Sequence, residues 1–398
     1  MELRERTDHL AASFKAAFGG VPAAYFSAPG RTELGGNHTD HQHGHVLAAA
    51  VDLDILAAVR PNGGDQVRIA SDGYVPFSVD LADLSPRGAE KNTSAALVRG
   101  VAAGFRDRGF DLSGAGFDAY LGSEIPAGSG LSSSAAFELL IGTIFNSLFC
   151  ADRLDPLTLA QIGQAAENVY FGKPCGLMDQ TAAALGGVVA IDFADPESPR
   201  AERIDLDLDA FGYALCIIDS GAGHADLTGE YAAITDELAA VARHFGRDEL
   251  RAVPEADFLS ALPALRKEAG DRAVLRAMHF YAEDARAVRE ADALRAGDLP
   301  RFLALVRASG RSSALYLQNA VPTGQTRRQE LLFTVALCER LLEGEGAVRL
   351  HGGGFGGTAQ AFVPLDRLDA FRRRTEAVLG DGSCRAVRIR PEGGVRLS

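Results

Sequence analysis

The chain has 398 residues, of which 47% are hydrophobic and 23% charged, and its formal net charge is −13. This length allows two or three domains' worth of core, and the negative charge argues against nucleic acid or an anionic membrane surface as a primary partner. The five cysteines are scattered without metal-type spacing, and the N-terminus is charged rather than apolar. We therefore expect a cytoplasmic globular protein.

The first predicted element is an amphipathic helix over residues 3–18, which stops at two glycines. A short strand over 25–28 follows, and the polar, glycine-containing stretch 31–45 is expected to be a loop. Strands over 54–60 and 66–71 are separated by Pro-Asn-Gly-Gly-Asp, which predicts a hairpin.

The stretch 126–134, Pro-Ala-Gly-Ser-Gly-Leu-Ser-Ser-Ser, connects a predicted strand over 117–124 to a predicted helix over 132–150 that is apolar on nearly every face. A helix N-terminus has free backbone N–H groups and the positive end of the macrodipole, so it stabilises an anion without a cationic side chain. The stretch is not a Walker A loop and lacks the third glycine of a dinucleotide fingerprint. We interpret it as a phosphate-binding loop, with an ordinary capped turn as the alternative.

The remaining pattern indicates two parts. A predicted helix over 155–171 is followed by the glycine-punctuated loop 172–180 and a further helix. Near residue 210 the pattern changes to mostly helical segments, and a second glycine-rich loop appears at 351–357. This change predicts an N-terminal domain over 1–205 and a C-terminal domain over 206–398.

A cluster of polar side chains follows the first strand and contains His38, Asp40, His41, His43 and His45. Alternation along a strand would put the last three histidines on one face, which permits zinc binding. The order is not that of a familiar metal site, so a metallohydrolase is the lesser alternative. An Asp with a neighbouring His and Asn can instead bind the hydroxyls of a sugar, and we rank a plain solvated loop below that hypothesis.

Taken together, these segments resemble the galactokinases of the GHMP kinase superfamily over nearly the whole chain and in the family's order. The motifs that carry the resemblance are residues 28–40, 126–135, 172–180, 224–231 and 352–357. The resemblance implies a mixed α/β (α+β) fold of the GHMP kinase type, with a ribosomal-S5-like N-terminal domain and a ferredoxin-like C-terminal domain. The active site would lie between the two.

The resemblance also implies site residues, with ATP and Mg²⁺ as cofactors and a small sugar as the second substrate. Asp179 would be the base for the anomeric C1 hydroxyl, and Arg31 would orient it and depress its pKa. The implied sugar contacts are Asn37, His38, Asp40, Gly176 and Tyr231. The implied phosphate contacts are Gly128, Ser129, Gly130, Leu131, Ser132, Ser133 and Ser134. The implied magnesium contacts are Ser133 and Glu167, and the third-motif loop contains Gly353, Gly354 and Gly356. No oligomeric state is implied, and a monomer is compatible with the sequence.

The chain departs from the family pattern at four motif positions. Asn37 stands where the family usually has Glu, and Glu33 stands where it has Asn. His41 replaces a Tyr, and His351 replaces a Thr. By resemblance, the usual Glu-His pair reaches the C6 hydroxyl of the sugar.

The departures leave the C6 group of the substrate open. Asn37 can bind a hydroxyl but lacks the charge that would repel a carboxylate, and galacturonokinases also lack the Glu and share the Asp-His-Gln of residues 40–42. Tyr231 favours galactose, so we expect ATP-dependent phosphorylation of the C1 hydroxyl of D-galactose to galactose 1-phosphate. The alternatives are a kinase for another galacto-configured sugar such as galacturonate, and a non-catalytic sugar and ATP sensor.

Overall fold

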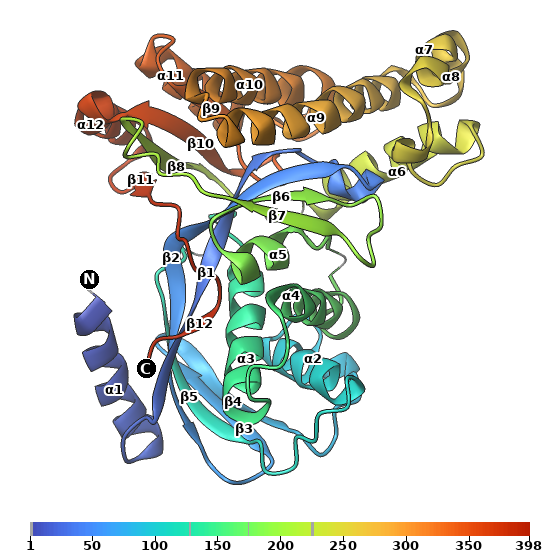
Figure 1. Ribbon diagram of the computed structural model, residues 1–398. Helices are drawn as coiled ribbons and strands as arrows, with labels where there is room; N and C mark the ends of the chain where they lie inside the picture. The colour runs from blue at the N-terminus through green and yellow to red at the C-terminus, as the bar shows by residue number, and fades with distance from the viewer. Residues whose placement is uncertain (1–2, 127–128, 174, 224–226) are drawn as a thin grey trace.

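The computed structural model describes residues 3–126, 129–173, 175–223 and 227–398. The first sheet has the order β12-β1-β2-β5-β3-β4. In addition, β6 pairs with β2, and β7 pairs with β6. Its strands are β1 (Ala24–Gly35), β2 (His45–Pro61), β3 (Gln66–Ser71), β4 (Tyr74–Asp80), β5 (Phe117–Ser123), β6 (Val188–Asp192), β7 (Arg200–Ile204) and β12 (Val395–Arg396). Most of this sheet and its helices form the lower half of the molecule in Figure 1, while β6 and β7 lie higher, below α9.

Helices cover both faces of this sheet. They are α1 (Leu3–Phe18), α2 (Ser94–Asp107), α3 (Ser133–Phe149), α4 (Pro156–Ala165), the π-helical turn η3 (Ala166–Phe171) and α5 (Met178–Leu185), with a short turn η2 (Gly88–Glu90) before α2. Helix α1 packs on Leu56 and Ala58 of β2, whereas Ala57 and Val59 belong to the core that contains α3. Alternate side chains of β2 therefore face opposite helical layers, as a strand's period of two requires.

The second sheet is antiparallel, with the order β11-β8-β10-β9. Its strands are β8 (Tyr213–Ala222), β9 (Ala347–Leu350), β10 (Gly357–Pro364) and β11 (Cys384–Val387). The helices of this half are α6 (Thr228–His244), α7 (Glu255–Ser260), α8 (Leu262–Glu268), α9 (Asp271–Arg295), α10 (Leu299–Ser312), α11 (Glu330–Leu342) and α12 (Leu368–Leu379), with short turns η4 (Leu250–Ala252), η5 (Ser313–Leu317) and η6 (Leu365–Arg367). Within the described residues, no helix is both long and apolar enough to span a bilayer.

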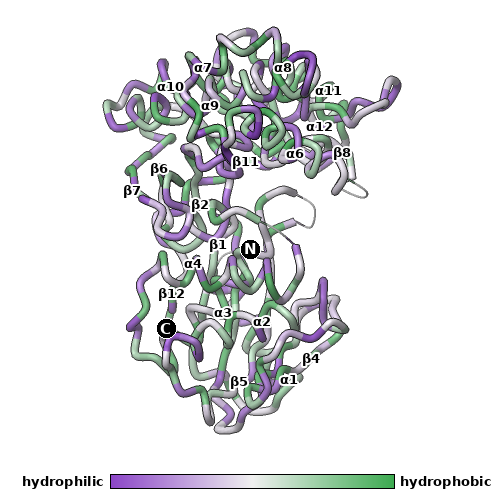
Figure 2. Tube along the Cα trace, turned by 90° about the vertical axis from the view of Figure 1, so that its right-hand side faces the viewer, coloured by the Kyte–Doolittle hydropathy of each residue, from purple (hydrophilic) through white to green (hydrophobic). Residues whose placement is uncertain are grey.

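The two halves are joined by the long strands β1 and β2, which Figures 1 and 2 show running from the lower half toward α9. The second sheet begins at Tyr213, close to the predicted domain boundary, while β12 pairs with β1 and so returns the end of the chain to the first sheet. The division at residue 205 remains a prediction. The mixed α/β fold expected from the sequence is confirmed.

Two local predictions are wrong. The stretch 31–45 does not begin as a loop, because β1 continues to Gly35 through two register shifts and its polar side chains find partners across the molecule. The segment 61–65 does not close a hairpin, because β3 lies beyond β5 and runs parallel to it. Asn62 and Gly64 exchange backbone hydrogen bonds with Gly116, so β5 takes the place beside β2.

The histidine face that the zinc-binding alternative requires is also absent. His41 lies in the 3-10 turn η1 (Asp40–Gln42), His43 has a φ of +60°, and β2 begins only at His45. The three rings therefore do not alternate on one strand. In the described ranges, no group of three or more His, Cys, Asp and Glu side chains is arranged to hold a metal ion.

Candidate active site

Arg31 and Asp179 form a bidentate ion pair at the centre of the site. Arg31 projects from β1, and Asp179 lies in the first turn of α5. Arg31 Nε donates to Asp179 Oδ1 and Nη2 donates to Oδ2, each at 2.7 Å. The Ser132 hydroxyl also donates to Asp179 Oδ2. This geometry holds both carboxylate oxygens in one orientation.

The surroundings of Asp179 keep it ionised. Burial would raise the pKa of its carboxyl, but the charge and hydrogen bonds of Arg31, with the bond from Ser132, outweigh burial and lower this pKa. The Asp179 side chain is still 25% exposed, whereas that of Arg31 is 7% exposed. An ionised, partly open carboxylate can accept a hydrogen bond from a substrate hydroxyl.

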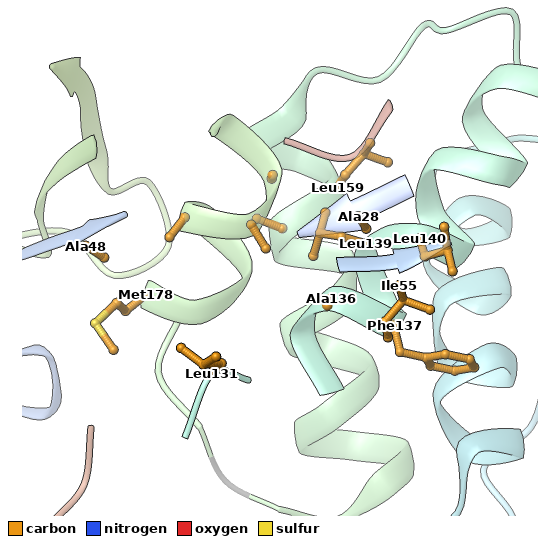
Figure 3. Close-up of a cluster of buried hydrophobic side chains, with 14 of the residues drawn as sticks. Ala28, Ala48, Ile55, Leu131, Ala136, Phe137, Leu139, Leu140, Leu159 and Met178 are labelled. Carbon is orange, nitrogen blue, oxygen red and sulfur yellow. The ribbon is translucent and has the colours of Figure 1, made fainter. Parts of the chain in front are cut away.

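The two motifs that carry Ser132 and Asp179 are anchored in one core. Leu131 directly precedes Ser132, and Met178 directly precedes Asp179. Both belong to a buried cluster with Ala28, Ala48 and Ala136 (Figure 3). Leu131 is almost fully buried. Because protein cores are close-packed, this cluster sets the position of the phosphate loop relative to the carboxylate.

The phosphate loop turns its carbonyl groups toward the protein. The Ser129 carbonyl accepts from Thr358 Oγ1 at 2.9 Å, the Gly130 carbonyl from Arg31 Nη1 at 2.6 Å, and the Leu131 carbonyl from the Arg31 amide at 3.0 Å. The backbone N–H groups of residues 130–135 donate to no acceptor within the part of the chain that the structure describes. Such a row of free amides at the start of a helix is an anion cradle.

Two further features of this loop suit a phosphate ligand. The Ser129 hydroxyl is buried and makes no hydrogen bond to any residue that the structure describes, so a ligand oxygen there would satisfy it. Gly130 and Ser132 both have left-handed backbone conformations, with φ of +71° and +53°, and a non-glycine residue held in this region is a common feature of active sites. Gly128, another predicted phosphate contact, lies outside the described residues.

The hydroxyl that lies beside Glu167 is that of Ser134. Ser134 Oγ donates to Glu167 Oε1 at 3.1 Å, and Lys173 Nζ donates to the same oxygen at 3.1 Å. Ser133, the serine expected to bind metal, is exposed at the start of α3. Hydroxyl and carboxylate oxygens are ligands that suit Mg²⁺, which usually keeps phosphate and water oxygens in its remaining positions. The donor set at Ser134 and Glu167 therefore fits this ion.

Glu138 and Gln180 lie behind this pair and were not predicted from the sequence. Gln180 Nε2 donates to Glu138 Oε2 at 2.9 Å and to Glu167 Oε2 at 3.0 Å. Burial, followed by the nearby charge of Glu167, raises the pKa of Glu138 well above its usual range. One signal was available: Glu138 is a lone acidic residue in an apolar helix, one turn after Ser134.

The other predicted sugar contacts converge on the third-motif loop and on Gly176. His38 Nε2 donates to the Gly353 carbonyl at 2.9 Å, and the Tyr231 hydroxyl donates to the Gly354 carbonyl at 3.1 Å. Gly176 lies against Asp40, because a Cβ placed there would be 2.2 Å from Asp40 Oδ2. Gly356 is similarly close to the backbone of residue 223. The structure thus gathers segments that are far apart in the sequence.

Asn37 occupies a different setting. It is fully buried, and its amide group donates to Glu33 Oε1 at 3.0 Å and to the Gly352 carbonyl at 2.7 Å. Its Oδ1 accepts from Asn319 Nδ2 at 2.9 Å and from Ser313 Oγ at 3.2 Å. The amide is therefore committed to protein partners on both sides, and its contact with a sugar remains a prediction.

Residues of the C-terminal half contact the segment 36–40, which we call the sugar motif, and hold its backbone in place. The sequence did not point to these residues. Glu283 Oε1 on α9 accepts from the amides of Gly36 and Asn37, at 3.2 and 3.4 Å. His279 Nε2 donates to the Asn37 carbonyl at 3.0 Å. Arg349 on β9 pairs with Glu33, and both side chains are almost completely buried. The backbone before His38 is thus bound to the other half of the molecule.

Comparisons with known proteins agree with this arrangement. Residues 12–61 match the galactokinase galactose-binding signature, and residues 96–187 match the GHMP kinase N-terminal domain. The chain is 34% identical over 379 residues to a galactokinase from Streptomyces coelicolor, covering 94% of each chain.

Solved structures give the same result for the fold. The crystal structure of Lactococcus lactis galactokinase complexed with galactose matches with a TM-score of 0.83 and 26% identity, over 98% of this chain and 100% of that chain. Methanococcus jannaschii mevalonate kinase matches with a TM-score of 0.64 and 14% identity, over 92% of this chain and 98% of that chain. The second likeness concerns the fold alone.

Proposed function

Because the chain belongs to the galactokinase family, we propose that it transfers the terminal phosphoryl group of ATP to the C1 hydroxyl of D-galactose, forming galactose 1-phosphate and ADP. As a member of this family, the protein is a sugar kinase that uses ATP. The observation that carries the proposal is the Arg31–Asp179 pair, whose partly open carboxylate lies beside the anion cradle of residues 130–135.

The reaction needs an aligned acceptor, charge neutralisation and exclusion of water. Asp179 accepts the proton of the C1 hydroxyl as the new oxygen–phosphorus bond forms and the bond to the bridging oxygen of ADP breaks. Arg31 orients this carboxylate, and its charge stabilises the transferring group. The amides at the start of α3 bind the phosphate oxygens.

Magnesium completes the proposal. Ser134 and Glu167 would hold Mg²⁺, which neutralises phosphate charge when bound. Lys173 adds a positive charge at Glu167 Oε1, to which its Nζ donates. Gln180 holds the second oxygen of Glu167, so the carboxylate is oriented by the protein before any ion arrives.

The sugar would lie between the first motif and the third-motif loop. Asp40 supplies a carboxylate for ring hydroxyls. Gly176 leaves space for this carboxylate, because any side chain at position 176 would overlap it. His38 and Tyr231, both hydrogen-bonded to the third-motif loop, flank the same region. These contacts support a hydroxyl-rich substrate.

Galacturonate is a second candidate substrate, favoured by the charge around the first motif. Asn37 is neutral, and Glu33 is paired with the buried guanidinium of Arg349. A carboxylate at C6 would therefore meet less repulsion here than beside a glutamate at position 37. The intact Arg31–Asp179 pair argues against the non-catalytic sensor.

A coupled assay for ADP release tests the proposal across galactose, galacturonate and glucose. We expect the highest kcat/KM with galactose and none above background with Asp179→Ala. A higher kcat/KM with galacturonate would show that galacturonate, not galactose, is the preferred substrate. Absence of ADP release with every sugar would overturn the kinase assignment.

The cytoplasmic location expected from the sequence belongs to the same proposal. All five cysteines are free thiols, which supports a reducing compartment. Cell fractionation with an antibody to the native protein tests it.

A further inference from the structure

A chain of hydrogen bonds connects the sugar-motif strand to the back of the phosphate loop. The Glu33 amide donates to His351 Nε2 at 3.4 Å, and His351 Nδ1 lies 3.0 Å from Thr358 Oγ1. The Thr358 hydroxyl donates to the Ser129 carbonyl at 2.9 Å. With a proton on Nδ1 of a neutral His351, all three bonds run in the same donor-to-acceptor direction.

His351 and Thr358 form a bracket across the mouth of the third-motif loop. The His351 amide donates to the Thr358 carbonyl at 3.1 Å, and both side chains are almost fully buried. The phosphate loop packs directly on them, because a Cβ at Gly130 would lie 3.1 Å from His351 Nδ1 and 3.5 Å from Thr358 Oγ1. The bracket therefore contacts the loop at Ser129 and Gly130 and the strand at Glu33.

The contact at Ser129 has a consequence for the ligand side of the loop. In a trans peptide the carbonyl of Ser129 and the N–H of Gly130 point in opposite directions. Holding the carbonyl on Thr358 therefore turns the Gly130 N–H away from Thr358, to the side of the peptide opposite this contact. Loss of this bond would let the peptide rotate and remove a donor from the cradle.

We propose that His351 and Thr358 are positioning residues that couple the phosphate loop to the sugar-motif strand, so that sugar and nucleotide bind cooperatively. The inference rests on the proposed function for the identity of the two ligands. Thr358 acts on the nucleotide through Ser129. His351 joins that contact to β1, the strand that carries Arg31 and leads into the sugar motif.

Calorimetric titration of the full-length protein with Mg²⁺ and a non-hydrolysable ATP analogue tests the first step. Thr358→Val keeps the shape but removes the hydroxyl, and we expect about a fivefold increase in the nucleotide Kd, the effect of one neutral hydrogen bond. Thr358→Ser keeps the hydroxyl and should bind nearly as wild type. Thr334→Val is the matched control, because the Thr334 hydroxyl is buried in α11 and has no hydrogen-bond partner in the described part of the chain.

The same titration with and without galactose tests the coupling. In the wild type we expect galactose to lower the nucleotide Kd by about fivefold or more. His351→Asn keeps a donor near Nδ1 but does not reach the Glu33 amide, so the nucleotide Kd without sugar should stay near wild type while the effect of galactose falls below about twofold. His351→Gln reaches the Nε2 position and should retain part of the effect.

Three results would overturn the inference: a Thr358→Val Kd equal to wild type, a wild type without cooperativity, or a His351→Asn variant with undiminished cooperativity. Thermal unfolding checks that each variant folds, and if Thr358→Val does not fold, the His351 variants decide. Galactose phosphorylation by the wild type is measured in parallel. If that fails while Thr358→Val still weakens nucleotide binding, the sugar assignment falls but the bracket's role at the loop stands.

Discussion

Arg31 and Asp179, separated by 148 positions in the sequence, meet through two parallel hydrogen bonds of 2.7 Å. The pair joins β1 to the first turn of α5, and the third donor of Arg31 reaches the Gly130 carbonyl. One guanidinium thus orients the carboxylate and the phosphate loop at the same time, which a lysine could not do because it lacks the planar fork.

Asp179→Asn should abolish most turnover. The amide cannot accept the hydroxyl proton, so we expect kcat to fall by about 10²–10⁴, with a smaller change in the KM for galactose. Stopped-time ADP assays on purified protein measure this, and thermal unfolding reports on the fold. A variant with wild-type kcat would remove Asp179 from the chemistry.

Ser134→Ala and Ser133→Ala separate the two candidate metal contacts. Of these two serines, Ser134 is the one that donates to Glu167. We therefore expect Ser134→Ala to weaken Mn²⁺ binding in the presence of nucleotide by about tenfold, the usual effect of removing a side chain that orients a metal ligand. Ser133→Ala should bind Mn²⁺ almost as the wild type does. Electron paramagnetic resonance of bound Mn²⁺ gives the affinity without turnover, and the opposite ranking would restore Ser133.

The KM for galactose should not titrate near neutral pH through His38. Burial, together with the neighbouring His41, lowers the pKa of His38 to about 4, so the ring stays neutral and donates to the Gly353 carbonyl down to that pH. The unfolded ring titrates at about pH 6.5, so this group's contribution to stability is complete above that pH and is lost as the pH falls toward about 4.

The measurement is KM for galactose from about pH 8 to 5, with unfolding free energies over the same range. His38→Gln, which keeps a neutral donor, is the comparison variant and should flatten the acid limb of the stability curve. A KM that changes tenfold between these limits in the wild type but not in His38→Gln would contradict the assignment.

Glu138→Gln should be tolerated. Because burial and the charge of Glu167 raise the pKa of Glu138 well above its usual range, the protonated carboxyl is favoured there, and a neutral amide is the closer substitute for it. We expect kcat and the equilibrium constant of unfolding to stay within about twofold of the wild-type values. Glu167→Gln is the contrasting variant, since it neutralises the carboxylate beside Ser134, and it should lose metal affinity. Equal loss in both variants would show that Glu138 is ionised.

Glu33 and Asn37 should be strongly coupled. Glu33→Asn leaves Arg349 buried without its carboxylate partner, and Nε and Nη1 of Arg349 already have no hydrogen-bond partner among the residues that the structure describes. Such a change costs about 3–5 kcal/mol. Asn37→Glu alone puts a second buried carboxylate beside Glu33. The double variant should recover at least about 1 kcal/mol relative to additivity in urea unfolding, and strictly additive losses would refute the coupling.

Several features could be predicted from the sequence because their signals are local. The spacing of apolar residues predicted α1 over residues 3–18, and the structure places it there. The glycine- and serine-rich stretch before an apolar helix predicted the start of α3 to within a residue. The contact between Arg31 and Asp179 and the lowered pKa of Asp179 were also expected, from motif resemblance, and both are present.

Other features depend on which segments meet in space. The spacing of Ser133 and Ser134 does not reveal which hydroxyl faces Glu167, because that depends on the rotation of α3 relative to η3. The exchange of Glu and Asn between positions 33 and 37 is visible in the sequence. Its meaning is not, because the ion-pair partner of Glu33 is Arg349, which lies 316 positions away.

The sequence by itself therefore determined the chemistry available: a carboxylate, a guanidinium, a phosphate loop and a polar sugar motif, each encoded in a short segment. Only the tertiary structure decided how these groups are held. Asn37 is enclosed by protein partners, and Thr358 reaches the Ser129 carbonyl. Such contacts join distant parts of the chain, and buried polar groups take whichever partners the packed fold brings within hydrogen-bonding distance.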